Sequence, residues 1–174
     1  PRGEVGEICF SGPQIFLGYL GDPENTAKTI SKDGFCYTGD VGFYDEKGLH
    51  FSGRAKLVIK PKGYQVFPED VENHIQEKLK DRAGMVAIVG VEHEVFSEGI
   101  MAFVEAKEEK AITPDEVLAA CADISAYSRP SHVVILKPGE IPLNRVAKTD
   151  YLNLRERATA IVRELRTEGK WDRK

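Results

Sequence analysis

After residue 54, the spacing of apolar residues predicts three helices. The first runs from Pro68 to about Leu79, with Pro68 and two acids in its first turn, and its apolar residues recur every fourth position: Val71, Ile75 and Leu79. The motif Thr113-Pro114-Asp115-Glu116 is a capping box that opens a second helix ending near Asp123. The third helix runs from about Asp150 to Arg166, and six apolar residues share one of its faces: Tyr151, Leu154, Ala158, Ile161, Val162 and Leu165.

Apolar runs between these helices predict strands. Met85–Val91 and Ile100–Glu105 are apolar on both faces, which is typical of inner strands covered by helices, and Val133–Leu136 gives a third strand. Leu57–Lys60 and Tyr64–Phe67 flank Pro61-Lys62-Gly63 and predict a hairpin ahead of the first helix. These elements predict a small α+β domain with a three-stranded sheet, flanking helices and a hairpin at its start.

The first 54 residues have a different composition, which is rich in glycine and aromatic residues. Glu7–Phe10 predicts a short strand, Asp22 can cap a helix over Pro23–Ile30, and residues 43–51 predict a hairpin. Strand edges in such a piece need neighbours that the chain does not contain. We therefore expect residues 1–54 to be a β-rich remnant at the end of a larger domain, and residues 55–174 to be a separate C-terminal domain.

Composition favours a globular protein and argues against several kinds of partner. With 41% apolar and 30% charged residues, the 174-residue chain is long enough to bury a core. A net charge of −4 leaves no basic patch for nucleic acid, and no apolar run approaches the roughly 20 residues of a membrane span. Three scattered cysteines suit reduced thiols in the cytoplasm, and the start of the chain has no signal-peptide pattern. The four histidines lack ligand spacing, so we expect no metal site.

Lys148 is the first candidate for catalysis. It ends the stretch Pro142-Leu143-Asn144-Arg145-Val146-Ala147-Lys148, just ahead of the third predicted helix. An ammonium group on such a loop can project into a cleft and neutralise charge where two anions are brought together. The alternative is an ordinary solvated lysine beside a helix start, and the residue type alone favours that alternative.

Two stretches further upstream are candidates for binding a nucleotide: Tyr37-Thr38-Gly39-Asp40 and Gly53-Arg54. Asp40, expected in a tight turn after Gly39, offers a carboxylate that can accept both hydroxyl groups of a ribose. Arg54 offers a planar donor fork for ribose or phosphate oxygens. The alternatives are a turn aspartate bonded to its own backbone and a salt bridge at a domain boundary.

The order and spacing of these motifs resemble the C-terminal part of the adenylate-forming enzymes, the acyl-CoA synthetase and luciferase superfamily. Gly3-Glu4-Val5-Gly6-Glu7-Ile8 with Gly18-Tyr19 is similar to the Gly-Glu-Ile … Gly-Tyr segment of that family, and residues 91–98 resemble its Gly-x-Pro-Asp … Gly-Glu loop in degraded form. Ile59-Lys60-Pro61-Lys62-Gly63-Tyr64-Gln65-Val66 looks like the CoA ligase branch. The resemblance covers nearly the whole chain. It implies that residues 1–54 end the large nucleotide-binding domain and that residues 55–174 form the C-terminal lid.

The resemblance also implies roles for the candidate residues. Lys148 matches the lysine of the adenylation step, Asp40 the aspartate that binds the ribose of ATP, and Arg54 an arginine that contacts the nucleotide. Lys56 matches a charged hinge residue about which the small domain rotates between the two half-reactions. The alternative for Lys56 is an exposed lysine in a linker.

In the predicted hairpin, Lys60 and Gln65 match residues that contribute to adenylate binding in the aryl- and acyl-CoA ligases. Lys62 and Gly63 match a pair that approaches CoA, where glycine lets the backbone come close to the pantetheine. The alternative is a solvated hairpin tip.

The chain departs from the family around Lys148. The family usually places Thr-Gly before the lysine, and this chain has Val146-Ala147 there. An arginine common three residues after the lysine is Tyr151 here, although Leu154-Arg155 matches again. If the usual glycine needs a positive φ, Ala147 strains the loop or resets it.

The implied function is that of an ATP-dependent carboxylic acid:CoA ligase, which forms acyl-AMP from the acid and ATP and then the thioester with CoA, releasing AMP. The chain has neither the phosphate loop of the Thr-Ser-Gly-Thr-Thr-Gly type nor an acid pocket, so we expect it to be inactive alone and not to bind the Mg²⁺ that accompanies ATP. Two alternatives stay open. One is an adenylation domain that loads a carrier protein, and the other is a stand-alone binding or regulatory module that kept the fold without catalysis.

Overall fold

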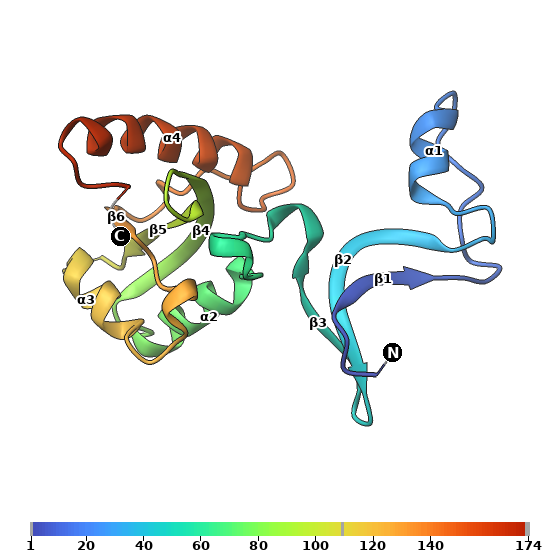
Figure 1. The fold of residues 1–174 in the computed structure, drawn as a ribbon, viewed down its shortest axis with the longest axis horizontal. Coiled ribbons are helices and arrows are strands. Elements are labelled where there is room, and N and C mark those ends of the chain that lie inside the picture. Colours follow the sequence, from blue (N-terminus) through green and yellow to red (C-terminus); the bar gives the residue numbers. More distant parts are fainter. Residues whose placement is uncertain (1, 109, 173–174) are drawn as a thin grey trace. The chain divides into compact units, whose positions relative to one another are not determined.

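The chain divides into two compact units, Pro1–Lys56 and Leu57–Lys174. The computed structural model describes residues 2–108 and 110–172 (Figure 1). No helix in the described residues is both long and apolar enough to cross a membrane.

Unit 1 (Pro1–Lys56) is built on an antiparallel sheet in the order β1-β2-β3, with β1 over Gly6–Phe10, β2 over Cys36–Asp45 and β3 over Gly48–Arg54. The predicted hairpin is confirmed, but its strands are longer than residues 43–51 because pairing continues back to Asp40 and Arg54. Helix α1, Pro23–Thr29, is confirmed with its predicted cap: the Asn25 N–H donates to the Asp22 carboxylate at 3.0 Å.

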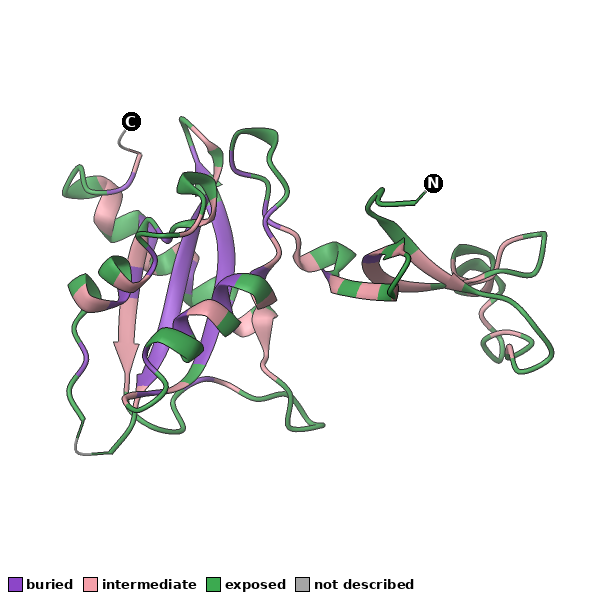
Figure 2. Ribbon diagram, turned by 90° about the horizontal axis from the view of Figure 1, so that it is seen from below, coloured by how far each residue is buried: buried purple, intermediate pink, exposed green. Residues whose placement is uncertain are grey.

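Unit 1 has almost no interior. Among residues 2–56, only Gly42 and Gly53 are buried, and neither has a side chain to bury. Figure 2 shows the unit almost entirely as exposed and half-buried ribbon. Its exposed large apolar residues are Val5, Phe10, Phe16, Leu17, Tyr19, Leu20, Phe35, Tyr37, Tyr44, Leu49 and Phe51. Apolar burial is the main force that folds a domain, so this unit lacks the core that would make it stable alone.

Unit 2 (Leu57–Lys174) is built on a second three-stranded sheet, in the order β4-β5-β6. Strand β4, Ala83–His93, runs antiparallel to β5, Ser97–Ala106, and β5 runs parallel to β6, His132–Leu136. The helices are α2, Pro68–Lys78; α3, Pro114–Ala120; and α4, Tyr151–Thr167. Two short 3-10 turns, η2 over Pro61–Gly63 and η3 over Ala126–Ser128, lie in this unit, and a third, η1 over Ala55–Leu57, includes the last two residues of unit 1. The α+β prediction, with a small sheet and flanking helices, is confirmed.

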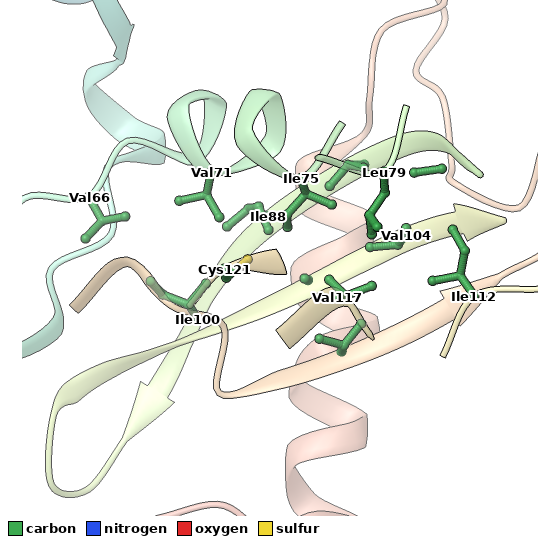
Figure 3. Close-up of a cluster of buried hydrophobic side chains, with 14 of the residues drawn as sticks. Val66, Val71, Ile75, Leu79, Ile88, Ile100, Val104, Ile112, Val117 and Cys121 are labelled. Atoms are coloured by element: carbon green, nitrogen blue, oxygen red, sulfur yellow. The ribbon is translucent and has the colours of Figure 1, made fainter. Parts of the chain in front are cut away.

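Helices cover both faces of this second sheet. On one face, the apolar side chains of α2 and α3 pack against alternate strand residues, as Figure 3 shows for Val71, Ile75 and Leu79 above Ile88 and Val104. On the other face, α4 lies along the sheet (Figure 1), and its residues Leu154, Ala158 and Val162 pack with Met101 and Phe103. The apolar faces predicted for α2 and α4 are therefore confirmed. Strand β4 was expected to be an inner strand; it lies at the sheet edge, and it is apolar on both faces because α2 and α4 pack on opposite sides of it.

Two local predictions are corrected. The hairpin predicted over Leu57–Phe67 contains a single pair, Ile59 with Val66, because Pro61–Gly63 coil into η2. Asp40 does not follow a tight turn: Thr38, Gly39 and Asp40 lie within β2, where Gly39 has φ +74°. Glycine adopts this left-handed conformation without strain, so the backbone can be irregular inside a strand. The same local sequence pattern is typical of a turn, which is why the sequence predicts a turn here.

Candidate functional site

Lys148 lies on an exposed loop between β6 and α4, and Asn144 gives this loop its shape. The Asn144 Oδ1 accepts hydrogen bonds from the N–H groups of Val146 and Lys148, each at 3.0 Å. The Asn144 N–H in turn donates to the Lys148 carbonyl at 2.7 Å. The backbone of the lysine is thus fixed at both its N–H and its carbonyl, while no described residue forms a hydrogen bond or ion pair with its ammonium.

Ala147, directly before this lysine, has φ +57°. The left-handed region disfavours residues with a Cβ, so alanine here carries a backbone strain that glycine would not. Ala147, which replaces the glycine of the usual Thr-Gly pair, is therefore the residue at which a positive φ makes glycine the better fit. The loop is strained but not reset, since the Ala147 N–H still closes a turn onto the Asn144 carbonyl at 3.0 Å.

The other departure, Tyr151, forms a contact that sequence reasoning missed. Its hydroxyl donates to the Glu72 Oε1 at 2.9 Å, and the Ile88 N–H donates to the same oxygen at 2.9 Å. This one carboxylate oxygen therefore joins α2, β4 and the first residue of α4. Burial raises the pKa of Glu72 to about 7, although both hydrogen bonds oppose the shift. Burial also raises the pKa of the Tyr151 hydroxyl, and the neighbouring Glu72 charge adds to that effect.

A sequence signal for Glu72 exists. It lies three residues before Ile75 and next to Val71, so it borders the apolar face of α2 rather than its solvent face. An acid at that position is buried when the helix packs, and it then needs a hydrogen-bonding partner.

In unit 1, the structure brings Asp40 and Arg54 together. They are directly opposite each other on β2 and β3, and the Arg54 Nε lies 2.9 Å from the Asp40 Oδ1. The Arg54 guanidinium also donates to the Thr38 carbonyl at 3.2 Å. The salt bridge weighed as an alternative for Arg54 is thus present, and its partner is the other candidate for nucleotide binding.

Neighbouring groups hold the Asp40 backbone in place. The Thr38 hydroxyl accepts from the Asp40 N–H at 3.0 Å and donates to the Ile8 carbonyl at 2.7 Å. The Gly39 N–H donates to the Glu7 carboxylate at 2.9 Å. The Thr-Gly-Asp stretch is therefore tied to β1 at Thr38 and at Gly39, and Asp40 is held through Thr38.

The loop over residues 59–66 carries four more of the predicted residues, and all of them are exposed: Lys60, Lys62, Gly63 and Gln65. Two backbone N–H groups fix this loop to the β4–β5 hairpin: that of Lys62 donates to the Phe96 carbonyl at 2.7 Å, and that of Lys60 donates to the Glu98 carboxylate at 2.5 Å. Gly63 has φ +84°, and a Cβ built on it would meet open space. Its backbone is therefore accessible to a ligand.

A cavity of about 180 Å³ lies beside this loop, within unit 2. Its lining includes Lys62, Phe96, Tyr127 and Arg129. The Lys62 ammonium lies 4.5 Å from the centre of the Phe96 ring, and the Tyr127 ring stacks on Tyr64 at 3.8 Å. Sequence reasoning did not single out Phe96, Tyr127 or Arg129. They come from two distant segments and share no local pattern, so only the fold places them beside Lys62.

Lys56 is exposed and ends unit 1, with Leu57 opening unit 2. Apart from Lys56, the predicted residues form three groups: Asp40 with Arg54 in unit 1, the 59–66 loop in unit 2, and Lys148 on another loop of unit 2. Within the described part of the chain, no cluster of three or more His, Cys, Asp or Glu side chains is arranged to hold a metal ion.

Comparisons with known proteins show which protein family the chain resembles. Residues 84–148 match the family model of the AMP-binding enzyme C-terminal domain. The chain is 43% identical over 122 residues to 4-coumarate–CoA ligase 2 of Nicotiana tabacum, which covers 67% of the chain and 21% of that protein. It is 36% identical over 163 residues to 4-coumarate–CoA ligase 3 of Oryza sativa subsp. japonica, covering 91% of the chain and 28% of the relative.

A solved structure extends the likeness to the fold. The ATP-bound MatB of Rhodopseudomonas palustris superposes with a TM-score of 0.83 at 32% identity, over 92% of this chain and 32% of MatB. The chain spans between about a fifth and a third of the length of these relatives. The chain therefore belongs to the adenylate-forming acyl- and aryl-CoA synthetases and corresponds to their C-terminal part.

Proposed function

We propose that this chain serves as part of an ATP-dependent carboxylic acid:CoA ligase. In the first half-reaction, a carboxylate oxygen of the acid attacks the α-phosphorus of ATP and pyrophosphate leaves, which gives an acyl-AMP. In the second, the thiol of CoA attacks the acyl carbon and AMP leaves, which gives the thioester. The relationship to 4-coumarate–CoA ligases supports this reaction class.

The exposed, unpaired ammonium of Lys148 on a loop of fixed backbone carries the proposal. Attack of one anion on another requires a positive charge that is already in position, because reorganising it during the reaction costs free energy. The Asn144 turn fixes the Lys148 backbone, and no described residue competes for its ammonium. Lys148 is therefore suited to stabilise the charge that develops in the adenylation step.

Asp40 and Arg54 are proposed to hold the nucleotide. Their ion pair joins β2 to β3 and holds the carboxylate in place, with the Asp40 side chain 28% exposed and the Arg54 side chain 46% exposed. Ribose hydroxyls can donate to the Asp40 carboxylate while the arginine fork reaches ribose or phosphate oxygens. Lys60 and Gln65 would contribute to the adenylate from the exposed loop of unit 2.

The CoA side is proposed to lie at the cavity beside Lys62. Lys62 and Arg129 supply cations for phosphate groups, and the Tyr127 ring in the cavity wall offers an aromatic surface for a purine, whereas the Phe96 ring is already stacked on His93 and lies against the Lys62 ammonium. The backbone at Gly63 is open enough for a pantetheine chain to pass. This cavity favours CoA as the acceptor over a carrier protein, which does not present an adenine.

The two units are proposed to be the end of the large nucleotide-binding domain and the C-terminal lid. The uncovered apolar residues of unit 1 support the first assignment, because they need a neighbouring layer to bury them. Lys56, at the end of unit 1, is proposed as the hinge of the lid.

The test separates the two half-reactions in the full-length protein that carries this chain. Lys148→Ala is expected to slow formation of acyl-AMP by at least about 100-fold, the scale on which preorganised charge acts. Thioester formation from a supplied acyl-AMP should change far less. Lys80→Ala, at an exposed lysine remote in sequence, is the control and should leave both steps unchanged. Equal losses in both half-reactions would refute the role of Lys148.

A further inference from the structure

The segment that follows α4 returns to the sheet and is buried there. Trp171 is only 2% exposed, and its indole N–H donates to the Glu92 carbonyl near the end of β4 at 2.9 Å. The indole lies directly over Gly99 on β5, where a Cβ would come within 2.6 Å of the ring. Gly99 thus leaves the space that Trp171 fills, and both residues lie where β4 and β5 meet.

Asp172 binds the chain just after the end of β4. Its carboxylate accepts from the Glu94 N–H at 2.9 Å and from the Arg166 Nε at 2.7 Å. Arg166 also donates to the Glu92 carbonyl at 3.1 Å. Trp171, Asp172 and Arg166, here called the C-terminal clasp, therefore bind the backbone on which the turn between β4 and β5 begins.

His93, the last residue of β4, connects the clasp to the turn between β4 and β5. It is 3% exposed, and its Nδ1 accepts from the N–H groups of Val95 and Phe96 at 3.1 and 3.2 Å. Its ring stacks on Phe96 at 4.4 Å and tilts against Trp171 at 5.5 Å. The direction of the Phe96 ring is thus set by a histidine that the clasp holds in place.

Phe96 connects this turn to Lys62 and to the cavity. Its carbonyl accepts from the Lys62 N–H at 2.7 Å, its ring lies 4.5 Å from the Lys62 ammonium, and both residues line the cavity. Lys62 itself has φ +51°, a backbone conformation that needs such support in a residue with a side chain.

We infer that the C-terminal clasp positions Phe96 and Lys62 for CoA, so that Trp171 and Asp172 are positioning residues for the thioester half-reaction. This inference rests on the proposed function, because it takes the cavity as the CoA side of the site. None of the three clasp residues lines the cavity. Their effect is transmitted through His93 and the turn.

The first experiment measures the physical link and needs no ligand. Amide hydrogen exchange is followed at Lys62, Val95 and Phe96 in this 174-residue chain and in Asp172→Ala, which removes the bond to Glu94 without emptying the core. We expect exchange at these three amides to accelerate at least about tenfold, while the amides inside α2 keep their rates. Unchanged exchange at Lys62 and Phe96 would overturn the inference, whether or not the chain binds CoA.

The second experiment measures CoA binding by calorimetry. Trp171→Leu and Asp172→Ala are each expected to raise the dissociation constant for CoA about tenfold, because a misplaced contact loses most of its value. Leu154→Ala is the matched control: it empties part of the same apolar cluster, but the Leu154 side chain forms no hydrogen bond or ion pair with the clasp, so this variant should leave the dissociation constant within about twofold. Each protein is compared well below its own unfolding temperature.

The outcomes separate the two proposals. An equal loss of CoA affinity in Leu154→Ala would show that general destabilisation is responsible and would overturn the inference. If the unaltered chain does not bind CoA, the CoA part of the proposed function and of this inference both fail. CoA binding that all clasp variants retain would overturn the inference alone. If Trp171→Leu fails to fold, Asp172→Ala decides, since its side chain is not in the apolar cluster.

Discussion

Glu72 is an acid placed where ionisation is costly. Its carboxylate oxygen accepts from Ile88 and Tyr151, yet burial outweighs these bonds and raises its pKa to about 7 from an ordinary 4.5. The folded state thus binds this proton more tightly than the unfolded state does. The resulting stabilisation is complete below about pH 4.5 and is lost as the pH rises through about 7.

This difference predicts how stability changes with pH. The free energy of unfolding of the chain minus that of Glu72→Gln should fall by about 3 kcal/mol between pH 4.5 and pH 8, because a pKa unit corresponds to about 1.4 kcal/mol. Urea titrations across this range measure it. Glu77→Gln, at an exposed acid on the same helix, is the control and should run parallel to the unaltered chain. Parallel curves for Glu72→Gln would contradict the assignment.

At the scale of the element, the loop before α4 combines a firm frame with one strained residue. Asn144 fixes the backbone of Lys148, but Ala147 holds φ +57° without the freedom of glycine. The strain is local, and the bonds of Asn144 on both sides maintain it.

Relief of this strain gives a second prediction. Ala147→Gly should raise the free energy of unfolding by up to about 1 kcal/mol, since the left-handed conformation penalises alanine more than glycine loses in the unfolded chain. Ala160→Gly, at an exposed site inside α4, should lower it by about 1 kcal/mol. Thermal or urea unfolding distinguishes the two. A loss of stability in both variants would show that Ala147 is not strained.

The helices could be predicted from the sequence because their signals are local. The caps Asp22 and Thr113 and the fourfold spacing of α2 lie within a few residues of the elements that they define. The single pair Ile59–Val66 could not be predicted, because η2 depends on the bond from Lys62 to Phe96, more than 30 residues away.

The candidate site likewise combines residues that local motifs reveal with contacts that only the fold creates. Lys148 and the Thr-Gly-Asp motif could be selected from sequence, since short motifs carry them. The pairing of Asp40 with Arg54 depends on strand register, and the contact of Glu72 with Tyr151 joins positions 79 residues apart. The aromatic and cationic lining beside Lys62 likewise needs the fold to bring residues 96, 127 and 129 together.

At the scale of the whole molecule, the two units differ in how they are stabilised. Unit 2 has two apolar clusters on opposite faces of its sheet, whereas unit 1 buries no apolar side chain among residues 2–56. A unit without a core cannot offset the conformational entropy lost on folding.

We therefore predict that residues 57–174 fold as a separate protein and that residues 1–56 alone do not. Trp171, the only tryptophan in the chain, reports on unit 2, and its fluorescence should show a cooperative unfolding transition with the same midpoint in the fragment and in the whole chain. Circular dichroism of residues 1–56 should show no cooperative transition. A cooperative melt of that peptide would refute the assignment of unit 1 to a larger domain.

The oxygen that α2, β4 and α4 share at Glu72 has a consequence for calorimetry. Near pH 7, folding takes up about half a proton at this position, since the group is half protonated when folded and almost fully ionised when unfolded. That proton comes from the buffer. Heats of unfolding measured in phosphate and in Tris will therefore differ by a share of the ionisation enthalpies of those buffers, and Glu72→Gln will remove this contribution.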